Sequence, residues 1–340
     1  MACGFFAAGV NIVSRRDGRR LFCFGLGFSA QALIRHLRIA DWYSGGTARD
    51  PEKVTALSTE GIDAVVWDGG VLSDAALNRI QAATHILIST PPSEAGDPAF
   101  AAAHQLIAEK SDIQWLGYLS TTGVYGDTGG AHVDETAQLN PSSPRSQRRV
   151  DAEAQWMSLF HDYGIPVHVF RLAGIYGSGR SPFDQIRGRQ AKRINKPGHA
   201  FSRIHVDDIA RVLAKSIANP KPGAVYNVCD DEPAPPAEVT AYACGLLGVE
   251  PPPLEEFEIV KERMSPMALS FWNDNRRVDN WKIREELGVK LAYPDYRSGL
   301  NAVLVNFKAR SLDIEVPTMQ LKAPISDSLS DPWECRQILQ

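Results

Sequence analysis

Cysteine is scarce in this sequence, and no two cysteines form a Cys-x-x-Cys pair. The 340 residues contain five, namely Cys3, Cys23, Cys229, Cys244 and Cys335. Zinc sites need closely spaced ligands, and the disulfide frameworks of secreted domains need a high density of cysteine. We therefore predict no metal site and no disulfide framework, and a reducing, cytoplasmic environment.

Long apolar runs and an excess of positive charge are also missing. The N-terminal stretch MACGFFAAGVNIV is too short to span a bilayer, and its arginines follow it rather than precede it as in a secretory signal. The 36 Lys and Arg against 40 Asp and Glu give a net charge of −4, which gives no global field that would attract nucleic acid. We expect neither a membrane nor a nucleic acid as partner.

What the sequence does contain is a regular alternation of apolar runs and helical patterns. The runs at 20–25, about 41–44, 62–67, 85–90 and 115–120 are typical of buried strands, with helices between them. A helix at 145–162, a strand VHVFRL, a helix within RIHVDDIARVLAKSIAN and a returning strand AVYNV follow. Such alternation predicts βαβ units, and hence an α/β fold with a Rossmann-type, doubly wound parallel sheet.

Glycine, proline and basic residues over 174–200, and Pro-rich turns with shorter helices from 233, predict a smaller C-terminal substrate lobe. We assign 20–178 and 203–232 to a dinucleotide-binding domain, and 179–202 and 233–310 to this lobe. Residues 1–19 form an N-terminal extension. Residues 311–340 lack periodicity, and we interpret them as a loosely ordered tail.

The stretch FGLGFSAQAL directly follows the first strand and opens the first helix. Here a G-x-G-x-x-A pattern allows a tight turn, a close approach of backbone N–H groups to a pyrophosphate, and close packing of helix on sheet. We assign this role to Gly25, Gly27, Phe28, Ser29 and Ala30. The alternative is a tight turn that holds no ligand.

The region SGGTARDPEK after the second strand offers a basic residue where NAD-binding proteins of this type carry an acidic one. Arg49 is placed to bind a 2′-phosphate, which favours NADP over NAD. Asp50 is either a ribose ligand or, before Pro51, the N-cap of the next helix, and we favour the N-cap.

Three separated motifs carry a family resemblance: LSTTGVYGD (119–127), FRLAGIYGSGR (170–180) and RIHVDDIA (203–210). Together they resemble the extended short-chain dehydrogenase/reductases, which include the NAD-dependent epimerase/dehydratase family. The late segment RRVDNWKIREELGVKLAYPDYRSGL (276–300) is most similar to the atypical, YeeZ-like branch. The resemblance spans about 20–305 and implies a Rossmann domain of six or seven strands, a nicotinamide dinucleotide cofactor and a substrate lobe.

The chemistry implied by the resemblance needs a Ser or Thr, a Tyr, and a Lys four residues after the Tyr. Thr121 falls on the Ser/Thr position, with a role either toward the reacting oxygen or as a cap of the loop. In PSSPRSQRRVDAE, alignment on Glu153 places Arg145 at the tyrosine position and Arg149 at the lysine position. The sequence has no tyrosine between Tyr125 and Tyr163 that could restore the pair.

Arginine remains protonated at physiological pH and cannot serve as a general base. Arg149 retains the capacity to bind the cofactor ribose, and Arg145 to stabilise an anion. Substitute proton donors would be Tyr125, Tyr176 or His205; each also has an interpretation as a packing or hydrogen-bonding residue.

Helix N-termini disfavour cations, so these arginines require an explanation. One interpretation is a solvated Arg–Glu ladder in which Glu153 is a surface partner of Arg149. We favour the other, in which the Arg145/Arg149 face meets the nicotinamide and a bound anion.

The resemblance suggests further ligands, and each has a structural alternative. Asp68 follows the third strand, where it would bind the adenine edge or shape a turn. Ser89 and Thr90 end the fourth strand, beside the cofactor's ribose and phosphates.

In RIHVDDIA, Asp207 or Asp208 is either the helix N-cap, which we favour, or a direct ligand, and we expect Arg203 to line the substrate cleft. We expect Arg171 to form a structural ion pair. Late polar residues either close the cleft or brace the lobe, namely Arg276, Arg277 and Asn280.

The stretch IRGRQAKRINKPG is either a solvated basic face or an attractor of an anionic substrate. By analogy with the family, a homodimer would form through the helix at 145–162.

Three functions are compatible with these residues. The first is an NADP-preferring oxidoreductase or epimerase/dehydratase-like enzyme of atypical mechanism, acting on a small anionic or sugar-like substrate. The second is a non-catalytic dinucleotide-binding sensor or scaffold. The third is a structural protein with an empty site.

Overall fold

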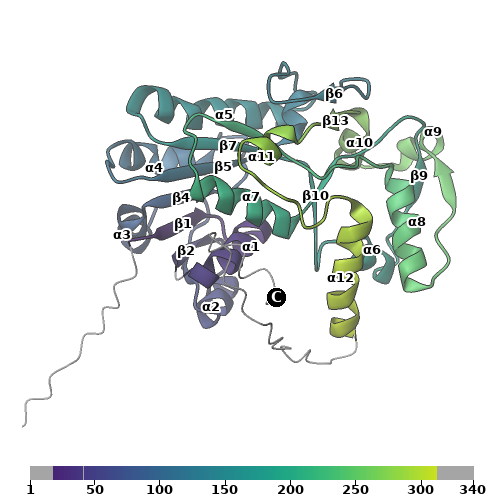
Figure 1. Cartoon of the computed structure of the whole chain (residues 1–340), viewed down its shortest axis with the longest axis horizontal. Coiled ribbons are helices and arrows are strands. Elements are labelled where there is room, and N and C mark those ends of the chain that lie inside the picture. The colour runs from purple at the N-terminus through teal and green to yellow at the C-terminus, as the bar shows by residue number, and fades with distance from the viewer. Residues whose placement is uncertain (1–17, 41, 312–340) are drawn as a thin grey trace, which may run out of the picture.

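Seven parallel strands form the central sheet of the computed structural model, which describes residues 18–40 and 42–311 (Figure 1). Their order across the sheet is β11-β7-β5-β4-β1-β2-β3. The bounds are β1 (Arg20–Phe24), β2 (Tyr43–Ala48), β3 (Asp63–Val66), β4 (His85–Ile88), β5 (Trp115–Thr121), β7 (Val167–Leu172) and β11 (Val225–Val228). The predicted α/β, doubly wound sheet is therefore confirmed.

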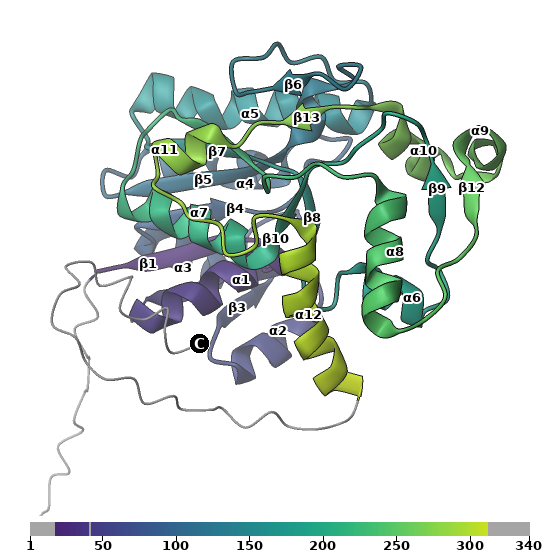
Figure 2. The same cartoon turned by 45° about the vertical axis from the view of Figure 1, so that its right-hand side comes forward.

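Helices cover both faces of this sheet (Figures 1 and 2). They are α1 (Phe28–Leu37), α2 (Pro51–Thr59), α3 (Asp74–Ala82), α4 (Pro98–Ala108), α5 (Pro144–Tyr163) and α7 (Val206–Ala218). One buried core includes side chains of α1 and α7, and a second includes side chains of α3, α4 and α5. Two cores on opposite faces are what a sheet buried on both sides requires.

The second strand runs over Tyr43–Ala48 rather than the predicted 41–44. Its run YSGGTA has weak strand propensity, because glycine offers no side chain to pack. Here the neighbouring strands require glycine. A Cβ on Gly45 would lie 2.4 Å from the Asp63 carbonyl oxygen, and one on Gly46 would lie 2.2 Å from the Cys23 carbonyl oxygen.

A smaller group of elements packs beside the carboxyl side of the sheet (Figure 2). It comprises α6 (Pro182–Arg187), β9 (Arg193–Asn195), α8 (Pro236–Leu247), β12 (Leu254–Glu256), α9 (Phe257–Val260), the 3₁₀ turn η3 (Lys261–Arg263), α10 (Pro266–Asn273) and α12 (Tyr296–Ser311). Its own core is built from α6, α8 and α12 around Phe183, Ala243 and Leu300. These residues belong to the predicted lobe.

Short elements connect the two parts. They are the 3₁₀ turns η1 (Arg38–Ala40) and η2 (Thr122–Tyr125), the strands β6 (His132–Val133), β8 (Gly174–Tyr176), β10 (Arg203–His205) and β13 (Arg277–Val278), and helix α11 (Trp281–Glu285). β10 pairs with β8, and β13 pairs with β6, both in parallel. The predicted extension and tail lie largely outside the described residues, at 1–17 and 312–340.

Candidate active site

The glycine turn lies between β1 and α1, as predicted. Gly25 has a φ of +88°, which disfavours any residue with a Cβ. A Cβ there would also lie 3.0 Å from Thr90 Cγ2. The Gly25 N–H donates to Thr47 Oγ1 at 2.9 Å, which holds the turn against β2. Gly25 and Thr90 are therefore brought together, and the turn can only be built with glycine.

The start of α1 is open. Its N-cap is Gly27, no side chain caps it, and its first turn contains no acidic residue. The first N–H groups of a helix have no intrahelical acceptor, so those of Phe28, Ser29 and Ala30 point out of the helix with its positive dipole end. Ala30 is fully buried, as its predicted packing role requires. This geometry suits an anion.

Ser89 and Thr90 lie at the same edge. The Ser89 N–H donates to the Phe24 carbonyl oxygen at 2.9 Å, and a Cβ on Gly27 would lie 3.8 Å from Ser89 Oγ. Thr90 Oγ1 is buried and has no hydrogen-bond partner among the described residues. Both side chains thus border the glycine turn.

Arg49 follows the last residue of β2 and is exposed. It forms no ion pair within the described part of the chain. The neighbouring carboxylate is engaged elsewhere, because Asp50 Oδ1 accepts the Glu52 N–H at 2.9 Å as the N-cap of α2. The predicted N-cap is confirmed. Asp68 is exposed after β3, where its Oδ1 accepts the Gly70 N–H at 3.0 Å within a turn.

Thr121 ends β5 and is the N-cap of η2. Its Oγ1 accepts the Gly123 N–H at 3.1 Å, which caps the 3₁₀ turn. A cap uses only the acceptor side of a hydroxyl, so the Thr121 hydrogen remains available for another contact.

The start of α5 lies against η2. Ser143 is its N-cap and accepts the Ser146 N–H at 3.2 Å. Ser146 Oγ lies 3.1 Å from the position of a Cβ on Gly123. This contact brings the first turn of α5 to the end of β5, where Thr121 lies.

The arginines of α5 differ in their surroundings. Arg145 is exposed, and its guanidinium lies 6.0 Å from the ring centre of Phe271, on α10 of the lobe. Arg149 is half-buried and donates to the Leu119 carbonyl oxygen at 2.8 Å and to the Tyr118 hydroxyl at 3.2 Å. Arg148 Nε is buried without a partner among the described residues. No carboxylate in this part of the chain pairs with any of the three.

Glu153 is not the surface partner of Arg149 that one interpretation predicted. It is 6% exposed and accepts from Arg171 Nη2 at 2.8 Å and from Ser120 Oγ at 2.5 Å. This face of α5 points toward the sheet, so the Glu153 carboxylate lies between α5, β5 and β7. The structural ion pair predicted for Arg171 is confirmed.

Two of the three substitute proton donors are held tightly inside the protein. The Tyr125 hydroxyl donates to Asn227 Oδ1 at 2.7 Å and accepts from Arg171 Nη1 at 2.9 Å. Burial raises its pKa. His205 is buried and accepts the Asp207 N–H at Nδ1, and desolvation lowers its pKa to about 4. We therefore assign neither side chain a contact with substrate.

Tyr176 is also buried, and desolvation raises its pKa far above the ordinary range. Its ring lies edge-on to His205, with the ring centres 5.2 Å apart. A Cβ on Gly299 of α12 would lie 1.9 Å from the Tyr176 hydroxyl oxygen, so this tyrosine packs closely against the lobe.

The predicted N-cap at Asp207 or Asp208 is wrong, because His205 caps α7. Asp208 is instead fully buried and accepts the N–H groups of Ala292 and Tyr293, at 2.8 and 2.9 Å. Those residues come from a distant segment, so this role left no signal near Asp208 in the sequence.

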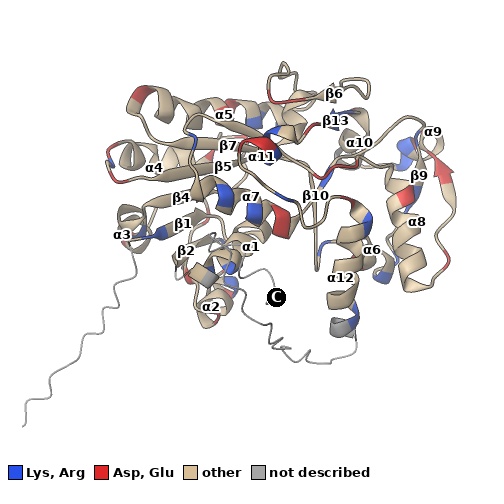
Figure 3. Cartoon of the chain, viewed as in Figure 1, with Lys and Arg blue, Asp and Glu red and all other residues tan. Residues whose placement is uncertain are grey.

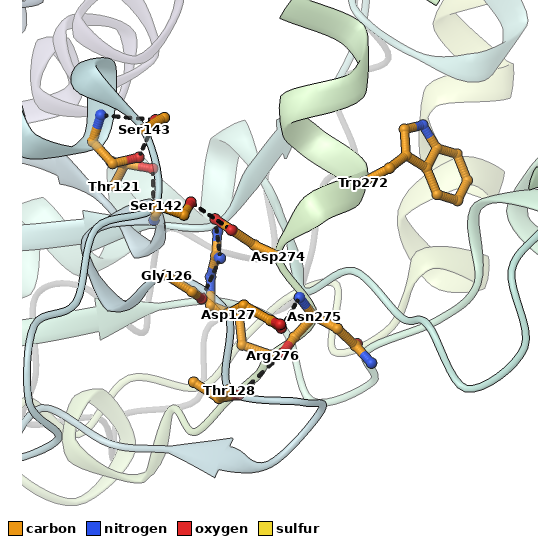
Figure 4. A network of polar contacts seen from close by, with 12 residues as sticks. Thr121, Gly126, Asp127, Thr128, Ser142, Ser143, Trp272, Asp274, Asn275 and Arg276 are labelled. Carbon is orange, nitrogen blue, oxygen red and sulfur yellow. Dashed lines mark hydrogen bonds and ion pairs between the residues drawn. The ribbon is translucent and has the colours of Figure 1, made fainter. Parts of the chain in front are cut away.

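A polar strap, which we define as Asp274, Asn275 and Arg276, connects the lobe to the loops beside the site (Figure 4). Asp274 accepts from Ser142 Oγ at 2.5 Å and from Arg276 Nη1 at 2.9 Å. Arg276 Nη1 also donates to the Gly126 carbonyl oxygen at 2.8 Å. The strap therefore fixes the residues just before α5 and just after η2.

The other polar residues for which we predicted a role at the cleft support the lobe and do not close the cleft. Arg277 donates to the Gly130 carbonyl oxygen, and Asn280 to the Cys229 carbonyl oxygen at 2.9 Å. Arg203, which is half-buried, donates to the Phe201 and Ala234 carbonyl oxygens at 2.9 and 3.0 Å.

Some basic side chains of the stretch IRGRQAKRINKPG form contacts within the protein. Lys196 donates to the Trp272 carbonyl oxygen and lies over the Phe257 ring. Arg187 pairs with Asp184 at 3.4 Å. In Figure 3, Lys and Arg as well as Asp and Glu are scattered over the elements.

Sequence reasoning missed Ser146, Asp274 and Asn275. The polar run NDNRR at 273–277 was a signal for the strap, but its partners Ser142 and Gly126 lie more than a hundred residues away. Ser146 lies between Arg145 and Arg149, the two residues on which the sequence-based hypothesis for this helix rested.

Within the described residues, no group of three or more His, Cys, Asp or Glu side chains is placed to hold a metal ion. The same residues include no helix with the length and hydrophobicity needed to cross a bilayer.

Comparison with known proteins supports the resemblance. The model of the NAD-dependent epimerase/dehydratase family matches residues 100–229. YeeZ of Escherichia coli K12 is 28% identical over 288 residues, covering 82% of this chain and 97% of YeeZ.

Two solved structures extend the comparison. A conserved protein of unknown function from Silicibacter pomeroyi is 48% identical, with a TM-score of 0.78 over 85% of this chain and 99% of that one. The dTDP-glucose 4,6-dehydratase of Bacillus anthracis, solved with NAD, is 17% identical and shares the fold with a TM-score of 0.71, over 86% and 98% of the two chains. The family model over residues 100–229 and the similarity to YeeZ over most of the chain together support the resemblance to the extended short-chain dehydrogenase/reductases, which include the NAD-dependent epimerase/dehydratase family.

Proposed function

We propose that this protein binds NADP(H) at the carboxyl edge of its sheet and acts as an oxidoreductase-like enzyme of atypical mechanism on a small anionic substrate. The observation that carries the proposal is the uncapped start of α1 beside Gly25. Free N–H groups, a positive dipole end and a turn that excludes side chains are what a pyrophosphate needs.

The preference for NADP(H) rests on the end of β2. Arg49 is exposed and without an ion pair among the described residues, whereas Asp50 is occupied as an N-cap. A 2′-phosphate would gain a charge-assisted hydrogen bond from Arg49. The other cofactor positions we propose are Gly25, Gly27, Phe28, Ser29, Ala30, Asp68, Ser89, Thr90 and Arg149.

The anionic character of the substrate rests on α5. Arg145, Arg148 and Arg149 occupy its first two turns, and no described carboxylate pairs with them. Three such charges at the positive end of a helix dipole are unfavourable unless an anion joins them. We assign the anion to Arg145, the most exposed of the three.

A second candidate function, a non-catalytic dinucleotide sensor, is favoured by one specific observation. Tyr125 and His205 are buried with their polar atoms engaged, and Tyr176 is packed under the lobe. None is placed as a free proton donor, and the Tyr-x-x-x-Lys pair is absent from the sequence.

Fluorescence titration with NADPH and NADH tests the binding proposal. We expect NADPH to bind in the micromolar range and about tenfold more tightly than NADH. If neither cofactor binds below millimolar concentration, the proposal is wrong. Loss of NADPH absorbance with small carbonyl acids then separates the two candidates, because the sensor binds cofactor without consuming it.

A further inference from the structure

A cavity lies at the amino end of the sheet, between the starts of β1, β2 and β3 and the second half of α3. Its volume is about 260 Å³. These elements lie on the side of the molecule away from the lobe (Figure 1). The lining combines small or apolar residues with five polar side chains, namely Arg20, Tyr43, Asp63, Asn78 and Arg79. The cavity is therefore separate from the glycine turn, which follows the opposite end of β1.

The carboxylate of this cavity already has its counter-charge. Asp63 Oδ1 accepts from Arg79 Nη2 at 2.6 Å, and Asp63 Oδ2 accepts from Arg79 Nε at 2.8 Å. The Tyr43 hydroxyl also donates to Asp63. Arg79 Nη1 donates to the Ala75 carbonyl oxygen at 2.8 Å. A guanidinium has five N–H groups, so these three bonds leave two that can bind a ligand.

Arg20 has no such counter-charge. Its guanidinium lies 5.3 Å from the ring centre of Tyr43, which holds it at the wall of the cavity. Arg20 is exposed and forms no ion pair among the described residues. It therefore adds an uncompensated positive charge to the cavity that Arg79 also lines.

A second cavity of about 210 Å³ adjoins the first, since Tyr43 and Asp63 line both. It adds Arg38, whose Nη2 donates to the Glu60 carbonyl oxygen, and no further carboxylate side chain from the described part of the chain. The two linings together contain three guanidinium groups and one carboxylate. This excess of positive charge favours an anionic ligand.

We propose that the larger cavity binds the phosphate group of a small molecule through Arg20 and Arg79. A phosphate ester carries about −1.5 to −2 charge at pH 7, which suits this excess. Its oxygens accept paired hydrogen bonds from guanidinium groups. The volume of about 260 Å³ lies below the roughly 300–1,000 Å³ of sites for drug-sized ligands, so the rest of the ligand must be small.

This inference is independent of the proposed function. Strand β2 runs from Tyr43 at the cavity to Ala48 at the other edge of the sheet, a distance of roughly 16 Å at ~3.3 Å per residue. The proposed cofactor positions, including Arg49, lie at that other edge. Phosphate and NADP(H) should therefore bind without competition.

Titration of the whole protein with inorganic phosphate, followed by ³¹P line broadening, tests this site. We expect a Kd of about 1 mM, with or without excess NADPH. Acetate has one charge and two oxygens, and it should displace phosphate only at about tenfold higher concentration. The inference is wrong if phosphate does not bind below about 50 mM, if NADPH displaces it completely, or if acetate competes equally well.

Two pairs of variants locate the phosphate. Arg20→Gln should weaken it by about tenfold, because a charged donor is lost. Arg35→Gln removes the same charge from an exposed position on α1 outside both linings, and it should change the Kd by less than about twofold.

The second pair adds a negative charge at the end of α3. Ala82→Glu places a carboxylate at an exposed position that lines the larger cavity, and it should weaken phosphate at least about tenfold. Gln81→Glu adds the same charge at the preceding exposed position, which lines neither cavity.

The outcomes are separable. If Arg20→Gln binds phosphate as tightly as Arg35→Gln, or if Ala82→Glu behaves like Gln81→Glu, phosphate does not occupy this cavity and the inference is wrong. If NADPH fails to bind to any of these proteins, only the proposed function is wrong, because the phosphate affinities of the paired variants still decide the inference.

Discussion

Helices α1 and α5 both begin at the carboxyl edge of the sheet, yet they present opposite kinds of surface. At α1 the N-cap is a glycine without a side-chain cap, and the first turn has no acidic residue. At α5 the N-cap Ser143 closes the helix with its side chain, Pro144 occupies the first turn, and arginines follow. The N-terminus of α1 therefore presents backbone N–H groups, whereas the N-terminus of α5 presents side chains.

This difference separates two requirements of the family fold. Under the proposed function, cofactor binding depends on backbone geometry, which Gly25 and Gly27 provide. The proposed reaction depends on side-chain identity at the start of α5, where the resemblance places Arg145 and Arg149 at the Tyr and Lys positions. A change in the second region leaves the first intact, so binding and catalysis need not be lost together.

The largest expected effect comes from breaking the support of α5. Glu153→Gln should destabilise the protein by about 3–5 kcal/mol, because it leaves the buried Arg171 guanidinium without its counter-charge. Urea unfolding measures this change. Glu255→Gln, in the exposed pair with Arg263, serves as control and should cost less than about 1 kcal/mol. Similar losses in the two variants would contradict the structural role of Glu153.

A substitution in the glycine turn before α1 should instead weaken the binding of NADPH. Gly25→Ala combines a φ of +88° with a contact of 3.0 Å to Thr90 Cγ2, so we expect NADPH to bind roughly 100-fold more weakly. Gly61→Ala is the matched control, since its φ is +76° and nothing lies within 4 Å. It should reduce stability alone. Equal NADPH affinity in the Gly25 variant and the wild type would refute the pyrophosphate assignment.

A third helix start at the same edge sharpens the comparison through pH. Burial holds the pKa of His205 at about 4, while Asp207 acts to raise it and Arg211 to lower it, whereas an unfolded histidine titrates near ~6.5. Between these values only the unfolded chain binds the proton, so stability is lost as pH falls. His205→Asn retains an acceptor for Asp207 without this titration.

We therefore expect the wild type to lose about 2 kcal/mol more stability than His205→Asn between about pH 7 and about pH 5. Parallel pH profiles of the two proteins in thermal unfolding would show that His205 is not buried as a neutral cap.

The smallest effect concerns the choice of cofactor. Arg49→Ala should weaken NADPH by about tenfold and leave NADH nearly unchanged, because only NADPH has a 2′-phosphate for the guanidinium. Competition titration with both cofactors measures this ratio. Equal weakening of both would place Arg49 outside the phosphate site.

Most of the sheet could be predicted because its strands are buried on both faces and appear as continuous apolar runs. β2 was placed incorrectly, since Gly45 and Gly46 are required by the backbone of neighbouring strands rather than by local propensity. The short strands β8, β9, β10, β12 and β13 have partners far away in the chain, so no local pattern marked them.

The candidate site was predictable where the backbone decides, as at Gly25 and Gly27. It was less predictable where distant partners decide. The hydroxyl of Tyr125 is held by Arg171 and by Asn227, which come from β7 and β11. His205 became a cap through the bend between β10 and α7. Neither outcome can be inferred from the residues that flank these side chains.

The buried pair of Glu153 and Arg171 has a consequence for the orientation of α5. Residues 145, 149 and 153 lie on one side of this helix, so anchoring Glu153 to β5 and β7 prevents the helix from rotating about its axis. The ion pair therefore fixes the direction in which positions 145 and 149 point, regardless of which side chains occupy them. The residues that fix the orientation of α5 are therefore different from the side chains at positions 145 and 149. Those two side chains can be replaced without a change in the fold that supports them.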